Sequence, residues 1–276
     1  MPKPTRAESA NRYSAILERI FLKRFAPGAT EVPFSRQDLV STARALRLKL
    51  PKNLGDIVYA LRYRVALPAS IRATQPEDSE WIIEGAGRAE YVFRLSRQSR
   101  LAPNPHLVTI KVPDATPEIV VAFAQSDEQA LLGKVRYNRL VDIFLGLTAY
   151  SLQNHLRTAV TGIGQIEIDE LYVGVDRFGC QFVIPVQAKG GSDQLSPVQT
   201  KQDLACCRTR FPQLLCRAVS AQFMADDLIA MFELRLVEDQ IKVVDEKHYR
   251  LVPADDITHD DLRSYAAAGA KDRSDL

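Results

Sequence analysis

The sequence contains no run of eighteen or more apolar residues, although 46% of its 276 residues are hydrophobic. A helix needs about 20 such residues to cross a bilayer, so no membrane-spanning helix is expected. The first residues, MPKPTRAESANRY, also lack the apolar segment of a secretory signal peptide. We therefore expect a cytoplasmic globular protein with enough apolar side chains for one large domain or two smaller ones.

Cysteine and histidine are scarce and scattered. The four cysteines form no CxxC pair, and the four histidines lie far from them and from one another: Cys180, Cys206, Cys207, Cys216, His106, His155, His248 and His259. This spacing argues against a zinc site and against a catalytic centre that needs a histidine beside a second histidine or an asparagine. A metal ion in this chain would be held mainly by oxygen atoms, which favours Mg²⁺ or Mn²⁺.

Neither sign of charge is in large excess, because 36 lysines and arginines stand against 34 aspartates and glutamates. The two signs are unevenly distributed, however. Residues 1–100 carry 18 basic and 10 acidic side chains, whereas the other residues carry 18 basic and 24 acidic ones. This division suits an N-terminal part that meets phosphate groups and a C-terminal part that holds carboxylates, with solvated surface charge as the alternative.

The N-terminal 100 residues begin with three predicted helices. Apolar spacing predicts helices over 12–25 and 52–64, and Ser35 with Asp38 predicts a capping box that opens a helix between them. Strands are expected at 81–84 and 91–95, around a glycine-containing turn. The third helix presents polar and basic residues opposite its apolar face, and these are candidates for DNA contact: Lys52, Asn53, Arg62 and Arg64.

This arrangement resembles a mainly helical winged helix-turn-helix domain, which lays one helix in the major groove of DNA. A small helical domain that packs on the rest of the chain or dimerises is the alternative. Residues 101–125 contain several prolines around a short strand, and we interpret them as a linker. A long helix is then expected from Asp127 to about Ala159, opened by Ser126.

The C-terminal domain, 126–253, is expected to continue with a β-hairpin. Residues 165–175 and 180–188 read as its strands, joined by a turn with Gly179 in a left-handed conformation. A helix over 196–210 and strands over 215–223, 228–237 and 240–250 follow. Residues 254–276 form an acidic tail that need not be ordered.

The order of these elements, helix, hairpin, helix and strand, is that of an α/β (α+β) domain, and together with two short segments it resembles the PD-(D/E)xK restriction-endonuclease-like superfamily. The segments are IEIDELYVG, which contains Asp169, and VIPVQAKGG, which contains Gln187, Ala188 and Lys189. The family usually has Asp or Glu where this chain has Gln187. The resemblance covers about residues 126–225 and implies a restriction-endonuclease-like core.

The hairpin turn decides which residues can meet. A three-residue turn with Gly179 left-handed places Asp169 opposite Gln187 and Glu167 opposite Lys189, on one face of the sheet. A two-residue turn would shift the register and bring Glu170 to that face in place of Asp169. The sequence alone leaves both registers open.

The resemblance implies that these residues hydrolyse phosphodiester bonds with Mg²⁺ or Mn²⁺. Asp169 would be the principal metal ligand, the side chain of Gln187 and the backbone carbonyl of Ala188 would complete the ligand set, and Lys189 would position the attacking water. A neutral amide is a weaker ligand than a carboxylate, and Glu167 or Glu170 could restore the missing charge. A polar strand end that faces solvent is the alternative interpretation.

The leading hypothesis is a Mg²⁺-dependent endonuclease that cuts double-stranded DNA, in restriction or phage defence, as a homodimer. A second hypothesis is a winged-helix DNA-binding regulator whose nuclease-like domain has lost activity through Gln187. A third is that the basic N-terminal part binds a protein partner.

Overall fold

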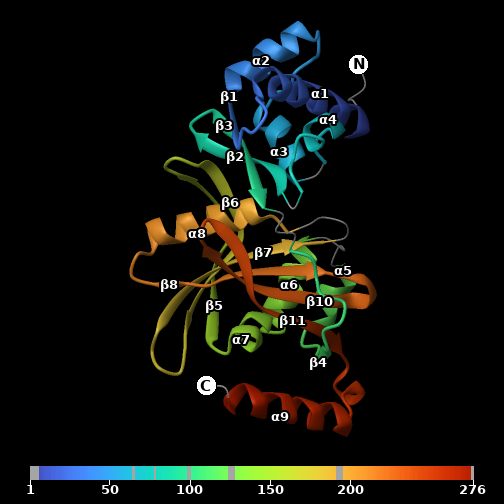
Figure 1. Cartoon of the computed structure of the whole chain (residues 1–276). Coiled ribbons are helices and arrows are strands. Elements are labelled where there is room, and N and C mark those ends of the chain that lie inside the picture. Colours follow the sequence, from blue (N-terminus) through green and yellow to red (C-terminus); the bar gives the residue numbers. More distant parts are fainter. Residues whose placement is uncertain are drawn as a thin grey trace. The chain divides into compact units, whose positions relative to one another are not determined.

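The computed structural model describes residues 6–63, 66–77, 79–97, 101–123, 128–190 and 195–274. It is a mixed α/β structure (Figure 1), and none of its described helices is both long and apolar enough to span a membrane. The chain divides into two compact units, and the first of them contains all of Met1–Arg100. Unit 1 also includes Arg157–Ile166 and Ser196–Gln202, so it is not one continuous segment.

Helices and a small sheet make up unit 1. Its elements are α1 (Arg6–Arg24), β1 (Glu31–Ser35), α2 (Arg36–Ala45), α3 (Gly55–Tyr63), α4 (Ala69–Arg72), β2 (Ser79–Gly87) and β3 (Glu90–Arg97). The described strands form an antiparallel sheet in the order β1-β3-β2. Phe21 of α1 is fully buried and lies against Trp81 of β2 and Phe93 of β3, so aromatic contacts join the first helix to the sheet.

Local sequence signals account for the start of α2. The backbone N–H of Ser35 donates to the carboxylate of Asp38 at 2.7 Å, and the N–H of Asp38 donates to the Ser35 hydroxyl at 3.3 Å. The predicted capping box is therefore confirmed. Burial raises the pKa of Asp38, but the hydrogen bonds from Ser35 and the charge of Arg24 outweigh it, so that the net shift is downward.

A hairpin tip from later in the chain is part of unit 1. The carbonyl oxygen of Ile163 approaches Gly85 of β2 so closely that a Cβ atom on that glycine would lie 2.1 Å from it. Glycine is therefore required at position 85, because any side chain would displace the hairpin backbone.

The segment Ser196–Gln202 also contacts the small sheet of unit 1. Its residue Lys201 lies 3.7 Å from Glu84, which also pairs with Arg94 at 2.7 Å.

Unit 2 is built on a large sheet. Its strands are β4 (Thr109–Pro113), β5 (Thr148–Val160), β6 (Gly164–Val175), β7 (Gln181–Lys189), β8 (Leu215–Cys216), β9 (Ala218–Phe223), β10 (Leu228–Val237) and β11 (Gln240–Val252). The described strands follow the order β4-β11-β10-β9-β7-β6-β5, with β8 paired to β7. β7 and β9 are parallel and are connected through α8 (Pro197–Arg210), while β6 and β7 form an antiparallel hairpin.

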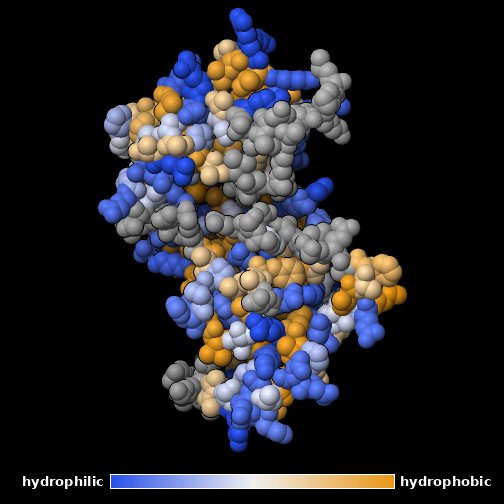
Figure 2. All heavy atoms as spheres, turned by 90° about the vertical axis from the view of Figure 1, so that its right-hand side faces the viewer, coloured by the Kyte–Doolittle hydropathy of each residue, from blue (hydrophilic) through white to orange (hydrophobic). Residues whose placement is uncertain are grey.

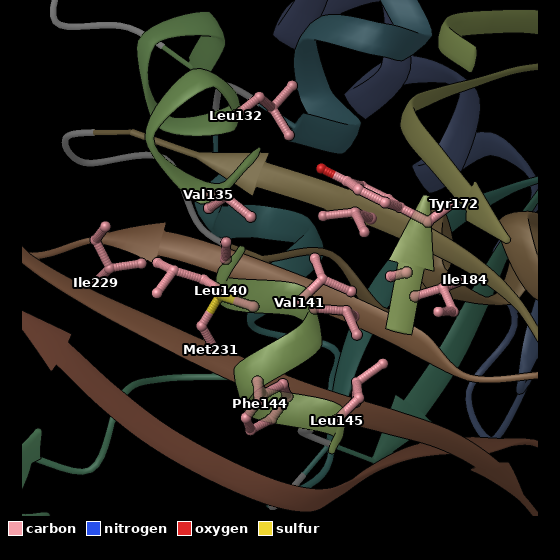
Figure 3. Close-up of a cluster of buried hydrophobic side chains, with 14 of the residues drawn as sticks. Leu132, Val135, Leu140, Val141, Phe144, Leu145, Tyr172, Ile184, Ile229 and Met231 are labelled. Atoms are coloured by element: carbon pink, nitrogen blue, oxygen red, sulfur yellow. The ribbon is translucent and has the colours of Figure 1, made fainter. Parts of the chain in front are cut away.

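Helices cover both faces of this sheet. On one face α6 (Glu128–Tyr137) and α7 (Leu140–Leu145) pack on strand residues such as Tyr172, Ile184 and Met231, as Figure 3 shows. On the other face Leu204 of α8 joins a cluster with Phe232 and Leu234 of β10. The sheet is thus a buried layer, and polar side chains on it need partners.

The long helix predicted from 127 to 159 is wrong. In its place α6 ends before Arg139, which has a left-handed backbone (φ 51°), and α7 ends at Gly146, which is also left-handed (φ 65°). The next residues form β5. Apolar side chains recur at helical spacing across both breaks, so periodicity alone could not separate two short helices from one long one.

Two further segments differ from their predicted descriptions. Residues 101–123, predicted as a linker, contain β4, which pairs in parallel with β11, and α5 (Glu118–Phe123). Figure 2 shows hydrophobic side chains at the surface of the protein. Separately, Ile119 and Phe123 of α5 are exposed. The linker interpretation relied on the prolines, which also occur beside short paired strands.

The predicted acidic tail contains a short 3-10 turn, η2 (Ala254–Asp256), and a helix, α9 (His259–Ser274). Thr258 and Asp261 cap the start of α9, because the Asp261 N–H donates to the Thr258 hydroxyl at 3.2 Å and the Thr258 N–H donates back to the Asp261 carboxylate at 2.8 Å. Lys111 of β4 pairs with Asp261 at 2.9 Å. These contacts order a segment whose composition alone indicated no structure.

Candidate functional site

The turn between β6 and β7 sets the geometry of the candidate site. The N–H of Asp176 donates to the carbonyl of Cys180 at 3.1 Å, and Gly179 is left-handed with φ 83°. The Asp176 carboxylate also accepts from the N–H groups of Phe178 and Cys180. This is the predicted three-residue turn, which is therefore confirmed.

The turn fixes the register of the hairpin. Glu170 pairs with Val186, the register expected for a three-residue turn. The Asp169 carboxylate then accepts a hydrogen bond from the backbone N–H of Ala188 at 3.0 Å. Asp169 thus lies at the end of β7 beside Gln187 and Ala188, in the register predicted for a three-residue turn.

Glu170 faces the opposite side of the sheet. Its side chain is fully buried and accepts from Arg136 of α6 at 2.8 Å and from the hydroxyl of Ser151 at 2.7 Å. The hydrogen bond to Glu170 is the main cause that raises the pKa of Arg136. The choice of Glu170 as a metal ligand beside Lys189 is therefore wrong, because successive strand residues point to opposite faces.

A shallow cavity of about 270 Å³ lies on that same face. Arg136, Arg139, Asp142, Ser151 and Tyr172 are among the residues that line it. The charges are already paired, since Arg136 binds Glu170 and Arg139 binds Asp142. Glu170 is therefore a structural residue on this face, where it binds Arg136 and Ser151.

Asp203 of α8 completes the site on the Asp169 face. It is 2% exposed, and its carboxylate accepts a hydrogen bond from the side-chain amide of Gln187. Charged residues on a helix usually face solvent, and Asp203 does not. Its spacing was the signal that could have shown this, because Thr200 and Cys207, three residues before and four after it, are both buried.

The surroundings of Asp203 shift the pKa of its carboxyl strongly. Burial raises the pKa of its carboxyl well above the usual value, and the hydrogen bond from Gln187 opposes that shift. The negative charge of Asp169 raises the pKa further, whereas the positive charge of Lys189 lowers it. These electrostatic effects identify Asp169, Gln187, Lys189 and Asp203 as one interacting cluster.

Two acceptor atoms of this cluster are unsatisfied. The side-chain oxygen of Gln187 and Oδ1 of Asp203 are buried and have no hydrogen-bond partner among the described residues. Buried acceptors without a partner are costly, and a bound cation would satisfy both. Mg²⁺ is usually held by one or two carboxylates and keeps several waters, so Asp169, Gln187 and Asp203 form a suitable donor set.

The cluster brings two carboxylates together, those of Asp169 and Asp203. Among the residues that the structure describes, no group of three or more His, Cys, Asp or Glu side chains could hold a metal ion. Glu167, predicted as a further ligand, lies 3.3 Å from the Nδ1 atom of His155 and is 40% exposed. The second carboxylate beside Asp169 is therefore that of Asp203 and not that of Glu167.

The predicted DNA-contact residues of unit 1 are only partly described. Lys52 and Asn53 are exposed and precede α3, which begins at Gly55 and not at residue 52. Asn53 is engaged locally, since its amide donates to Asp56 at 2.8 Å and its side-chain oxygen accepts from the Gly55 N–H at 3.1 Å. Arg64 and the side chain of Arg62 lie outside the described residues.

Comparisons with known proteins identify no relative. The chain matches no protein-family model, and no curated protein or solved structure is significantly similar to it.

Proposed function

We propose that the chain is a metal-dependent DNA endonuclease of the restriction-endonuclease-like type, with its reaction centre at Asp169, Gln187, Lys189 and Asp203. The observation that carries the proposal is the pair of unsatisfied buried oxygens, on Gln187 and Asp203, beside the Asp169 carboxylate. Such an arrangement is expensive unless a cation or a substrate completes it.

The order of elements also supports this assignment. A hairpin that ends in Gln187-Ala188-Lys189 leads through a helix to a parallel strand, as the PD-(D/E)xK resemblance implies. Ligands in α/β sheets bind outside the carboxyl ends of parallel strands, where Lys189 ends β7. The neutral Gln187 is compensated, because Asp203 brings a carboxylate to the same place from α8.

Each residue of the cluster has a distinct task in phosphodiester hydrolysis. Asp169 and Asp203 would hold Mg²⁺ or Mn²⁺ together with the side-chain oxygen of Gln187, and the amide of Gln187 keeps Asp203 oriented. In an extended strand, the N–H and the carbonyl of one residue point to the same side. The N–H of Ala188 donates to Asp169 on β6, so the carbonyl of Ala188 also faces β6. A bound divalent ion supplies positive charge that polarises the phosphodiester. Lys189 would orient the attacking water and offset charge that develops on the phosphate.

Unit 1 would provide DNA binding. The proposal of a winged helix-turn-helix domain is supported by the helices and the antiparallel β1-β3-β2 sheet of unit 1, and by the 18 basic against 10 acidic side chains of residues 1–100. Double-stranded DNA is the proposed substrate. A cytoplasmic role in restriction or phage defence, and action as a homodimer, follow from the family resemblance alone.

A second candidate function is that of a winged-helix DNA-binding regulator without catalytic activity. The raised pKa of Asp203 favours it, because burial disfavours the charged form of that carboxyl and Gln187 adds no charge for a cation. DNA binding would then persist without cleavage.

Plasmid cleavage separates the two functions. Purified protein is incubated with supercoiled plasmid in Mg²⁺, in Mn²⁺ and in EDTA, beside Lys189→Ala and the surface control Lys242→Ala. The endonuclease is supported if cleavage needs the metal, is lost in Lys189→Ala and is retained in Lys242→Ala, with DNA binding intact in all three proteins. Binding without cleavage under every metal condition supports the regulator.

A further inference from the structure

The segment between α2 and α3 is unusually rich in exposed cations. Residues 39–55 contain four basic side chains and no acidic one. All four are exposed, and none forms an ion pair with any residue that the structure describes: Arg44, Arg47, Lys49 and Lys52. We call residues 44–52 the basic turn. Four exposed like charges that form no ion pair among the described residues attract a polyanion.

The backbone of the basic turn is held by a defined helix ending. The N–H of Leu48 donates to the carbonyl of Ala43 at 2.9 Å, and the N–H of Arg47 donates to that of Arg44 at 3.1 Å. This is the Schellman pattern, in which the residue at the position of Arg47 is left-handed and is usually glycine. Arg47 has φ 55°, so an arginine side chain occupies a place where it is conformationally unfavourable.

Leucines fix the basic turn to the core of unit 1. Leu48, Leu50 and Leu54 are partly buried and pack against the hydrophobic cluster that contains Ile57. Basic and apolar residues alternate in RLKLPKNL, so that each leucine points inward and each cation points outward. The cations therefore project from a rigid backbone, which lowers the entropy cost of binding a ligand.

We propose that the basic turn binds the phosphate backbone of duplex DNA. This inference rests on the proposed DNA-binding function of unit 1 and assigns it to a particular surface. Lysine and arginine side chains bind phosphates without sequence information. Asn53, the neighbouring residue whose amide could read adenine, is occupied by Gly55 and Asp56.

The composition of the turn favours a duplex over a single strand. Proteins that bind single strands stack bases on aromatic side chains, and residues 35–58 contain no aromatic residue. An arginine kept in a left-handed conformation is consistent with a binding role, because glycine would suit the helix ending better.

The test measures binding of the full chain to a fluorescent 30-base-pair duplex over a series of salt concentrations, in EDTA to prevent cleavage. The variant Arg44→Ala/Arg47→Ala/Lys49→Ala/Lys52→Ala is compared with a control that removes the same charge from exposed residues of unit 2, Arg177→Ala/Arg210→Ala/Arg235→Ala/Lys242→Ala. Each phosphate contact contributes about 0.9 to the slope of log K against log salt. We expect the slope to fall by about 3 to 4 in the basic-turn variant and by less than about 1 in the control.

A single substitution separates binding from structure. Arg47→Gly removes one cation and relieves the left-handed strain, so we expect the melting temperature to rise by about 2 °C while the salt slope falls by about 0.9. A purely structural role for Arg47 would leave DNA affinity unchanged. Scrambling the duplex sequence should change the affinity of the wild-type chain by less than about threefold if this surface supplies most of the binding energy.

The outcomes distinguish this inference from the proposed function. If the wild-type chain binds the duplex and the basic-turn variant keeps the same slope and affinity, the inference is wrong and DNA binding resides elsewhere. If the wild-type chain binds no duplex, or binds an acidic protein or double-stranded RNA in preference, the DNA-binding function itself is overturned.

Discussion

The side-chain amide of Gln187 on β7 donates a hydrogen bond to the carboxylate of Asp203 on α8, and both side chains are buried. The contact joins a residue of the family-like motif to one that lies sixteen positions later in the chain. It leaves one oxygen of each side chain without a partner among the described residues. Buried acceptors without a partner are costly, and a bound cation would satisfy both of these oxygens.

Asp203→Asn should separate stability from function. Asparagine can still accept from Gln187, but the carboxyl that burial disfavours is gone, so in EDTA the variant should be at least as stable as the wild type. Mn²⁺ should raise the melting temperature of the wild type and not that of the variant, because only a bound ligand stabilises the fold by mass action. Cleavage should fall at least about 100-fold.

Differential scanning fluorimetry with and without Mn²⁺ measures the first two effects, and plasmid cleavage measures the third. A variant that is still stabilised by Mn²⁺ and still cuts DNA would remove Asp203 from the reaction centre.

Gln187→Glu should restore the acidic residue that is usual at this position in the superfamily that the motif resembles. Without metal, a third carboxylate beside Asp169 and Asp203 should destabilise the chain by roughly 2 kcal/mol. With Mn²⁺ the extra charge should tighten metal binding and increase the thermal shift relative to the wild type. Isothermal titration with Mn²⁺ measures the affinity, and unchanged or weaker binding would mean that the Gln187 side chain does not reach the ion.

Glu170→Gln should lower stability and Asp169→Asn should lower activity, because the two residues lie on opposite faces of β6. Glu170→Gln breaks the ion pair with Arg136 and should cost about 2 kcal/mol, below the roughly 3–5 expected for a fully buried pair, since the Arg136 side chain is 37% exposed. Its cleavage rate per folded molecule should be unchanged. Asp169→Asn should abolish cleavage.

Urea denaturation followed by cleavage assays tests both variants under conditions where each is folded. Loss of cleavage in folded Glu170→Gln, with activity retained in Asp169→Asn, would reverse the assignment of the two carboxylates.

Gly85→Ala should destabilise unit 1. Its Cβ atom would lie 2.1 Å from the carbonyl oxygen of Ile163, and the forced backbone shift should cost about 1–3 kcal/mol. Gly133→Ala is the matched control, because no atom lies within 4 Å of the added Cβ in α6. That change should stabilise the helix by about 0.5–1 kcal/mol. Calorimetry measures both, and equal effects would show that the hairpin does not pack on β2.

Sequence reasoning succeeded where the determinants were local. The capping box at Ser35 depends on two residues three positions apart, and the register of the β6–β7 hairpin follows from the turn that Gly179 closes. The position of Asp169 at the end of β7, where its carboxylate accepts from the Ala188 N–H, was therefore predictable from the three-residue turn. Short-range hydrogen bonding carries this information because it involves only neighbouring residues.

It failed where tertiary packing or an unusual residue decided the outcome. The helix break at Arg139 depends on a left-handed arginine. No glycine or proline there predicts the end of a helix. The burial of Asp203 depends on how α8 packs on β7 and β9, and a polar residue on a helix is exposed more often than it is buried. The missing acidic ligand was consequently sought nearby, at Glu167 and Glu170.

The most direct test of the proposed centre is a crystal of the protein soaked in MnCl₂, with an anomalous difference map recorded near the manganese edge. The account predicts a peak about 2–2.3 Å from carboxylate oxygens of both Asp169 and Asp203, with the side-chain oxygen of Gln187 as a further ligand. A map without a peak between these side chains at millimolar Mn²⁺, or with manganese bound only on the Glu170 face, would contradict it.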